Sequence, residues 1–241
     1  MIRAYHRPKS ITEALVLLDR KDPRTIPLAG GSAVSKLTEE VDVVDLQDLG
    51  LDKLEVGSDL ISVGAMTRVA QLENLAFGPW LALEGPRNLQ NTATLGGVLV
   101  RSDGRSMITT ALLAYDAKLF WAPGNLEINL GDWLPQRKSW KAGKIITEIK
   151  WGSKPELRIE TIGRSPLDTP LLIVAMTKWS SGRTRIVVGG FGVMPTLAMD
   201  GPSANGAEEA AKAACLTSTD AWASAEYRSE VAGILARRLV S

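Results

Sequence analysis

Two double-glycine stretches, Leu28-Ala29-Gly30-Gly31-Ser32 and Thr94-Leu95-Gly96-Gly97, decide how this 241-residue sequence is interpreted. The first follows a predicted strand, 25–28, and precedes a predicted short helix, 33–37. Glycine permits positive φ and lets backbone N–H groups approach an anion closely, and a helix N-terminus adds a favourable dipole for phosphate. Two such loops can hold a pyrophosphate from opposite sides. A double glycine also marks ordinary tight turns, and neither stretch has the spacing of a P-loop or of a Rossmann GxGxxG motif.

The counts of metal-binding residues exclude several kinds of chemistry. The chain has one cysteine, Cys215, and one histidine, His6. An iron–sulfur cluster needs about four thiolates, and a zinc site needs three or four ligands. A disulfide within the chain is impossible. Any redox metal chemistry therefore belongs to another polypeptide.

The charge balance and the hydropathy exclude other classes. Lys and Arg number 28 against 27 Asp and Glu, so the basic excess typical of nucleic-acid binders is missing. No apolar run approaches the ~20 residues that cross a bilayer, so no membrane span is expected. The first residues lack the apolar core of a signal peptide, and a cytoplasmic location is expected.

The hydrophobic pattern predicts an α+β chain with a mixed N-terminal portion. Ser10 caps a predicted helix that ends near residue 19, and Thr67 is the predicted cap of another through residue 75. Residues 152–155 are the best candidate linker. Beyond it we expect three strands, at 156–163, 171–179 and 183–189, and then two helices. The last helix is expected to have an apolar stripe, formed by Tyr227, Val231, Ile234, Leu235 and Leu239.

Seven segments occur in a fixed order along nearly the whole chain. They are PLAGGSAVSKL (27–37), ISVGAMT (61–67), LQNTATLGG (89–97), ALLAYDA (111–117), RSPLDTPLLIVAMTK (164–178), RIVVGGFGVMP (185–195) and SAEYR (224–228). In this order they resemble the flavin-binding medium subunits of molybdenum hydroxylases, the family of carbon monoxide dehydrogenase, multi-subunit xanthine dehydrogenase and aldehyde oxidase. No single segment is decisive, but the combination is specific.

The resemblance implies a fold of the vanillyl-alcohol-oxidase/PCMH type, a FAD-binding domain built from two α/β subdomains. A small C-terminal domain with a three-stranded antiparallel sheet and helices would follow. The implied FAD-binding domain covers residues 1–152, with subdomains at about 1–48 and 49–152. The C-terminal domain covers residues 156–241.

The resemblance also implies a function. The chain would be a FAD-containing electron-transfer subunit, an oxidoreductase subunit that is not active alone. Electrons would come from [2Fe–2S] clusters on a small partner subunit and leave to an external acceptor. Molybdopterin would be bound by a large partner subunit, with a dimer of heterotrimers as one arrangement of the complex.

The implied cofactor-binding residues lie in and after the two loops, where backbone amides would hold the pyrophosphate of FAD. They are Ala29, Gly30, Gly31, Ser32, Ala33, Thr94, Gly96 and Gly97, together with Asp103 and Ser106 of the loop that follows. Asp103 and Ser106 also fit an ordinary solvated loop. No catalytic residue and no metal ligand are expected on this chain.

The sequence departs from the family pattern at several positions. Val98 stands where relatives usually have Asn, Met107 where they have Asp, and Gln90 where they have Arg. The segment between residues 75 and 89 is also shorter. The alternative hypothesis is therefore a degenerate, flavin-free structural subunit of such a complex. A self-contained flavin oxidase or reductase ranks lower, because no substrate base or flavin-attachment histidine occupies a suitable place.

Overall fold

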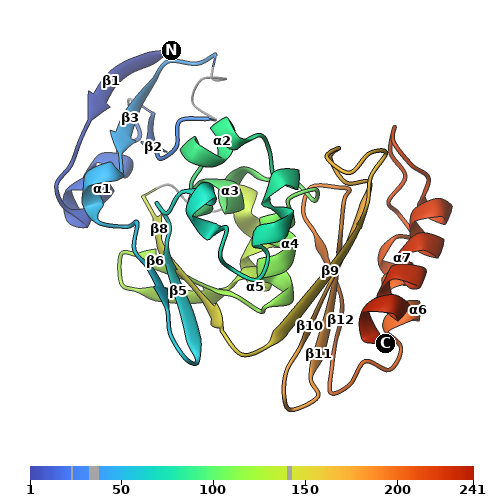
Figure 1. The fold of residues 1–241 in the computed structure, drawn as a ribbon. Helices are drawn as coiled ribbons and strands as arrows, with labels where there is room; N and C mark the ends of the chain where they lie inside the picture. The colour runs from blue at the N-terminus through green and yellow to red at the C-terminus, as the bar shows by residue number, and fades with distance from the viewer. Residues whose placement is uncertain (23, 33–37, 140–142) are drawn as a thin grey trace.

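The computed structural model describes residues 1–22, 24–32, 38–139 and 143–241, which form three sheets in chain order (Figure 1). The first sheet is parallel, with strand order β1-β3-β2, and consists of β1 (Ile2–His6), β2 (Thr25–Leu28) and β3 (Val41–Asp45). The central strand β3 is buried along its whole length, as parallel strands covered on both sides are. The predicted helix 33–37 lies outside the described residues.

Helix α1 (Ile11–Leu18) covers the first sheet, and its start follows the prediction from Ser10. The Ser10 hydroxyl accepts a hydrogen bond from the Glu13 N–H at 3.2 Å. The Glu13 carboxylate accepts one from the N–H of Lys9 at 2.9 Å, one residue earlier than in a standard capping box. Residues Ala14, Leu17 and Leu18 of the helix are buried.

The second sheet is antiparallel and has the order β4-β5-β8-β6-β7. Its strands are β4 (Leu54–Val56), β5 (Leu60–Gly64), β6 (Lys118–Ala122), β7 (Leu126–Asn129) and β8 (Ile145–Gly152). The short 3₁₀ helix η2 (Gln47–Leu49) precedes β4. The helices between β5 and β6 are η3 (Val69–Leu72), η4 (Gly78–Leu83), α2 (Arg87–Thr92), α3 (Leu95–Arg101) and α4 (Met107–Ala114). Helices α5 (Leu130–Trp133) and η5 (Leu134–Ser139) follow β7.

The predicted helix from Thr67 to residue 75 is wrong in type and length. Only Val69–Leu72 is helical, as the 3₁₀ turn η3, and its N-cap is Arg68. Thr67 is instead buried and joined to the second glycine loop, because its carbonyl accepts a hydrogen bond from the N–H of Leu95 at 2.9 Å. A tertiary contact therefore replaces the predicted local cap.

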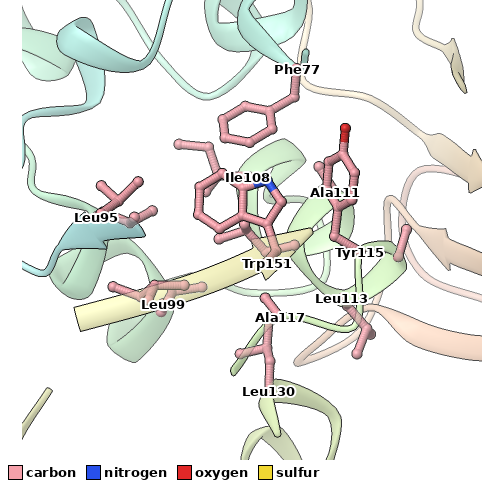
Figure 2. Close-up of a cluster of buried hydrophobic side chains, with 14 of the residues drawn as sticks. Phe77, Leu95, Leu99, Ile108, Ala111, Leu113, Tyr115, Ala117, Leu130 and Trp151 are labelled. Atoms are coloured by element: carbon pink, nitrogen blue, oxygen red, sulfur yellow. The ribbon is translucent and has the colours of Figure 1, made fainter. Parts of the chain in front are cut away.

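Helix α4 is the centre of the largest hydrophobic cluster, and all eight of its residues are buried. Figure 2 shows part of this cluster, in which Ile108 and Ala111 of α4 lie among side chains from other elements. The Trp151 ring of β8 packs at 6.1 Å from the Phe77 ring and 6.2 Å from the Tyr115 ring, measured between centroids. The same cluster extends into the third sheet through Ile173, Ala175 and Val187.

The third sheet is antiparallel and has the order β12-β11-β10-β9. Its strands are β9 (Glu156–Ile162), β10 (Leu172–Lys178), β11 (Thr184–Gly189) and β12 (Thr196–Gly201). The predicted number of three strands is wrong, because β12 adds a fourth. Its sequence, TLAMDG, is short, contains Ala, Asp and Gly, and lies at the sheet edge, so it lacks the β-branched run that marks a buried strand.

Helices α6 (Ala207–Ala214) and α7 (Ala225–Val240) cover the face of the third sheet opposite α4, on the right of Figure 1. The predicted apolar stripe of α7 is partly wrong. Tyr227 is 45% exposed and Ile234 is 37% exposed, whereas Arg228 is fully buried. Small residues such as Ala232 and Gly233 face inward, where the helices approach closely. In the described part of the chain, no helix is both long and apolar enough to span a membrane.

Candidate functional site

The first double-glycine loop lies against the segment that leads into the second. A Cβ atom on Gly30 would lie 2.0 Å from the carbonyl oxygen of Thr92 and 3.0 Å from the Cα of Ala93. No side chain fits in that space, so glycine at position 30 is required by the neighbouring backbone. Gly31 has a φ of +77°, a conformation that favours glycine.

A cleft of about 200 Å³ runs along this contact. The first loop contributes Gly30 and Ser32, and the second contributes Thr94 and Gly97. The other lining residues come from the surrounding helices: Val69, Glu84, Leu89, Gln90, Ala93, Val98, Arg101 and Ser102. The structure thus brings together two loops that are more than sixty residues apart in sequence, as the sequence analysis predicted.

The backbone donors of the two loops differ in their hydrogen bonding. Within the described part of the chain, the N–H groups of Gly30 and Gly31 have no acceptor. In the second loop, the Gly96 N–H donates to the Ala65 carbonyl at 2.8 Å and the Gly97 N–H donates to the Thr94 hydroxyl at 3.2 Å. The first loop therefore has donors available for an anion, whereas the second loop serves chiefly as the start of α3.

Close packing also explains the second glycine pair. A Cβ on Gly96 would lie 2.9 Å from the Cβ and 3.0 Å from the carbonyl oxygen of Ala65, at the end of β5. Thr94 is the N-cap of α3. These contacts fix the second loop on the second sheet, and the two residues just before it, Thr92 and Ala93, contact Gly30.

Of the other predicted site residues, Ala29 packs beside the hydrophobic cluster under α1, and Ala33 lies outside the described residues. Asp103 does not line the cleft, since its side chain is exposed and its carboxylate accepts from the Arg105 N–H at 2.8 Å. Ser106 is the N-cap of α4 and also lies outside the cleft lining. Their neighbours Arg101 and Ser102 line it instead.

Glu84 is a site residue that the sequence analysis missed. Its carboxylate lies at the N-terminus of α4, where it accepts hydrogen bonds from the Ser106 hydroxyl at 2.9 Å and from the Ile108 N–H at 3.1 Å. Burial raises the pKa of Glu84, and the hydrogen bonds from Ile108 and Ser106 oppose this rise. No local sequence signal marks this residue, because its partners lie more than twenty positions along the chain.

The positions that depart from the family pattern have different environments. Val98 lines the cleft, whereas Met107 is 1% exposed and belongs to the core around α4. The buried Gln90 amide donates to the carbonyls of Leu81 at 2.9 Å and Gly85 at 2.7 Å. Gln90 therefore holds the shortened segment 75–89 over one end of the cleft.

The loop between α3 and α4 is fixed by the C-terminal part of the chain. The Gly104 N–H donates to the Gly192 carbonyl at 3.0 Å, and the Gly190 N–H donates to the Gly104 carbonyl at 2.7 Å. Arg105 pairs with Asp220 at 2.6 Å, and its guanidinium lies 4.4 Å from the centre of the Trp222 ring. The loop after α3 is thus held by contacts from beyond residue 189.

Sequence comparisons place this chain among flavin proteins. The family model for the FAD binding domain in molybdopterin dehydrogenase matches residues 1–151. The uncharacterized protein YgfM of Escherichia coli K12 is 29% identical over 157 residues, which cover 62% of this chain and 59% of that protein. The carbon monoxide dehydrogenase medium chain of Afipia carboxidovorans is 40% identical over 70 residues, or 26% of this chain and 24% of that one. The matched region thus spans less than two thirds of these relatives.

Solved structures share the fold over almost the whole chain. Quinoline 2-oxidoreductase from Pseudomonas putida 86 matches with a TM-score of 0.80 at 20% identity, covering 98% of this chain and 95% of that one. The Cu,Mo-CO dehydrogenase matches with a TM-score of 0.80 at 22% identity, covering 99% and 96%. The fold and the resemblance inferred from the seven segments are confirmed: this chain belongs to the family of FAD binding domains in molybdopterin dehydrogenases.

Proposed function

We propose that this chain is the FAD-containing electron-transfer subunit of a multi-subunit molybdenum hydroxylase and is not active alone. When bound, FAD supplies the redox chemistry, taking electrons from [2Fe–2S] clusters on a small partner subunit and giving them to an external acceptor. Molybdopterin belongs to a large partner subunit in this proposal. The observation that carries it is that the N–H groups of Gly30 and Gly31 have no acceptor among the described residues and lie beside a cleft that both glycine loops line.

The residues of the cleft fit a dinucleotide. Gly30 and Gly31 would donate to the pyrophosphate through their N–H groups, which have no acceptor in the described part of the chain. Thr94 would hold the second loop in place through its cap on α3. The apolar side chains of Val69, Leu89 and Val98 would exclude water from the part of the cleft they line.

The flavin-free structural subunit remains the second candidate, and one observation favours it. The N–H groups of Gly96 and Gly97 already have acceptors within the chain, so the second loop has fewer free donors than the resemblance implies. In that case the fold would serve only to hold partner subunits. The amount of flavin in the purified protein separates the two candidates.

The test measures flavin directly. The complex is purified with its partner subunits, its visible spectrum is recorded, and released flavin is quantified after denaturation. One FAD per chain supports the proposal, and a colourless protein that releases no flavin overturns it.

A matched pair of variants then locates the site. Gly31→Val adds a branched side chain to the proposed phosphate-binding loop, whereas Gly206→Val imposes comparable backbone strain at the start of α6, since Gly206 has a φ of +81° and open space around it. We expect only Gly31→Val to lose FAD. Equal FAD content in both variants would mean that the pyrophosphate is held elsewhere.

We also propose that the chain is divided as the resemblance implies, into residues 1–152 and 156–241. The first two sheets fall within the first range and the third sheet within the second, which supports this division. The core around α4 is shared by both parts.

A further inference from the structure

The lining of the cleft includes one residue that neither the glycine motifs nor the family resemblance indicates. Arg101 is the last residue of α3 and lines the cleft together with Gly30, Ser32 and Gly97. Among the residues that the structure describes, no other Lys or Arg side chain lines this cleft. An arginine guanidinium has five donors in a planar fork, which suits phosphate oxygens.

In the described part of the chain, the Arg101 side chain has neither a counter-ion nor a hydrogen-bond acceptor, whereas each of the arginines near it has one or the other. Arg87 pairs with Glu73 at 3.2 Å, and Arg105 pairs with Asp220 at 2.6 Å. Arg68 and Arg137 donate to backbone carbonyls. A cation in a concave site without a protein partner attracts anions from solution.

The acidic residue of the cleft does not neutralise Arg101. The Glu84 carboxylate is bonded to the Ser106 hydroxyl and the Ile108 N–H, at the positive end of the α4 dipole. Both carboxylate oxygens therefore accept hydrogen bonds from the first turn of α4. Among the described residues of the cleft lining, the other charged side chain is that of Arg101, beside the N–H groups of Gly30 and Gly31, which have no acceptor in that part of the chain.

We propose that Arg101 is a phosphate-binding residue, whose guanidinium contacts the pyrophosphate that the first glycine loop holds. This inference rests on the proposed function, because it takes the pyrophosphate of FAD as the ligand. The structural alternative is that Arg101 only stabilises the C-terminal end of α3 through the helix dipole. The two roles differ in whether the effect of Arg101 depends on a phosphate in the ligand.

The experiment compares two flavins that differ in phosphate. The full chain is freed of flavin, and binding of FAD and of riboflavin is measured by titration calorimetry for the wild type, Arg101→Gln and Arg101→Lys. We expect Arg101→Gln to weaken FAD binding about tenfold or more and to leave riboflavin binding unchanged. Arg101→Lys should recover part of the loss, and the FAD affinity of Arg101→Gln should depend less on salt.

The control is Arg87→Gln, which removes an exposed arginine on α2 that does not line the cleft. It should bind FAD as the wild type does. Equal FAD affinity for the wild type and Arg101→Gln would overturn the role of Arg101 and leave the proposed function intact. Equal weakening of FAD and riboflavin, with a lower melting temperature, would assign Arg101 to the helix end and overturn it as well.

If the wild type binds no FAD, the proposed function fails, and inorganic pyrophosphate becomes the probe. Pyrophosphate binding that Arg101→Gln abolishes would still support an anion site at Arg101. The absence of such binding would overturn this inference too.

Discussion

Gly30→Ala is the sharpest test of the contact between the first glycine loop and the segment that leads into the second. The added methyl group would lie 2.0 Å from the Thr92 carbonyl oxygen and 2.8 Å from its carbonyl carbon. An ordinary contact of this kind is 3.4 Å or longer. Both sides of the clash are backbone, so no side chain can rotate away, and the loops must move apart by more than 1 Å.

The expected cost follows from this geometry. Inserting a methyl group into a packed site costs about 1–3 kcal/mol, and replacing glycine restores about 0.4–1 kcal/mol by restricting the unfolded chain. For a chain of this size, each kcal/mol lowers the melting temperature by roughly 2–4 °C. Because the cleft lies along this contact, we also expect FAD affinity to fall about tenfold or more, which corresponds to ~1.4 kcal/mol.

The assay is thermal unfolding together with FAD titration of the flavin-free protein. The control is Gly201→Ala at the end of β12, where the nearest atom to an added Cβ is 3.6 Å away. It should be neutral or slightly stabilising. If Gly30→Ala behaves like this control in both measurements, the loops do not touch as described and the reasoning about the site fails.

Three further changes probe other parts of the molecule. Burial raises the pKa of Glu84, so the native state binds this proton more tightly than the unfolded state and loses stability as the pH rises through the raised pKa. The melting temperature of Glu84→Gln should therefore rise relative to that of the wild type between pH 4 and pH 8. A difference that stays constant with pH would contradict this. Arg228 is fully buried and donates to the Leu171 carbonyl at 3.0 Å and to Asp220 at 2.9 Å. Arg228→Leu should therefore lower the free energy of unfolding, measured in urea, by about 3–5 kcal/mol. A loss below about 1 kcal/mol would refute its structural role. Burial raises the pKa of Cys215 to about 11, so its thiol should react with Ellman's reagent only after unfolding. Fast stoichiometric reaction of the native protein would show instead that the thiol is accessible.

The elements that could be predicted from the sequence are those whose burial is nearly uniform. Strands β10 and β11 lie between α4 on one face and α6 and α7 on the other, so their unbroken apolar runs were a sufficient signal. The edge strand β12 and the 3₁₀ turn η3 carry no such run. In α7, the prediction is right for Leu235 and Leu239, which are buried, and wrong for Tyr227 and Ile234, because small residues and Arg228 occupy the rest of the buried face.

The candidate site shows the same division. The double glycines predicted the two loops, because glycine has no side chain and its position can be taken directly from the sequence. Glu84 and Arg101 could not be found in this way, because their roles depend on α4 and on the cleft, which exist only after distant segments have met. Asp103 and Ser106 follow the second loop closely in sequence, but they lie outside the cleft lining, and backbone hydrogen bonds join Gly104 between them to Gly190 and Gly192.

The position of α4 has a consequence for how the protein is made. During synthesis α4 is translated well before β10 and β11, and the side of α4 that contacts these strands stays exposed to solvent until they emerge. The FAD-binding part alone would therefore expose an apolar surface, and we expect it to engage chaperones or aggregate when the chain is interrupted near residue 152. The core around α4 is therefore completed only after residues of β10 and β11, such as Ile173 and Val187, have joined it.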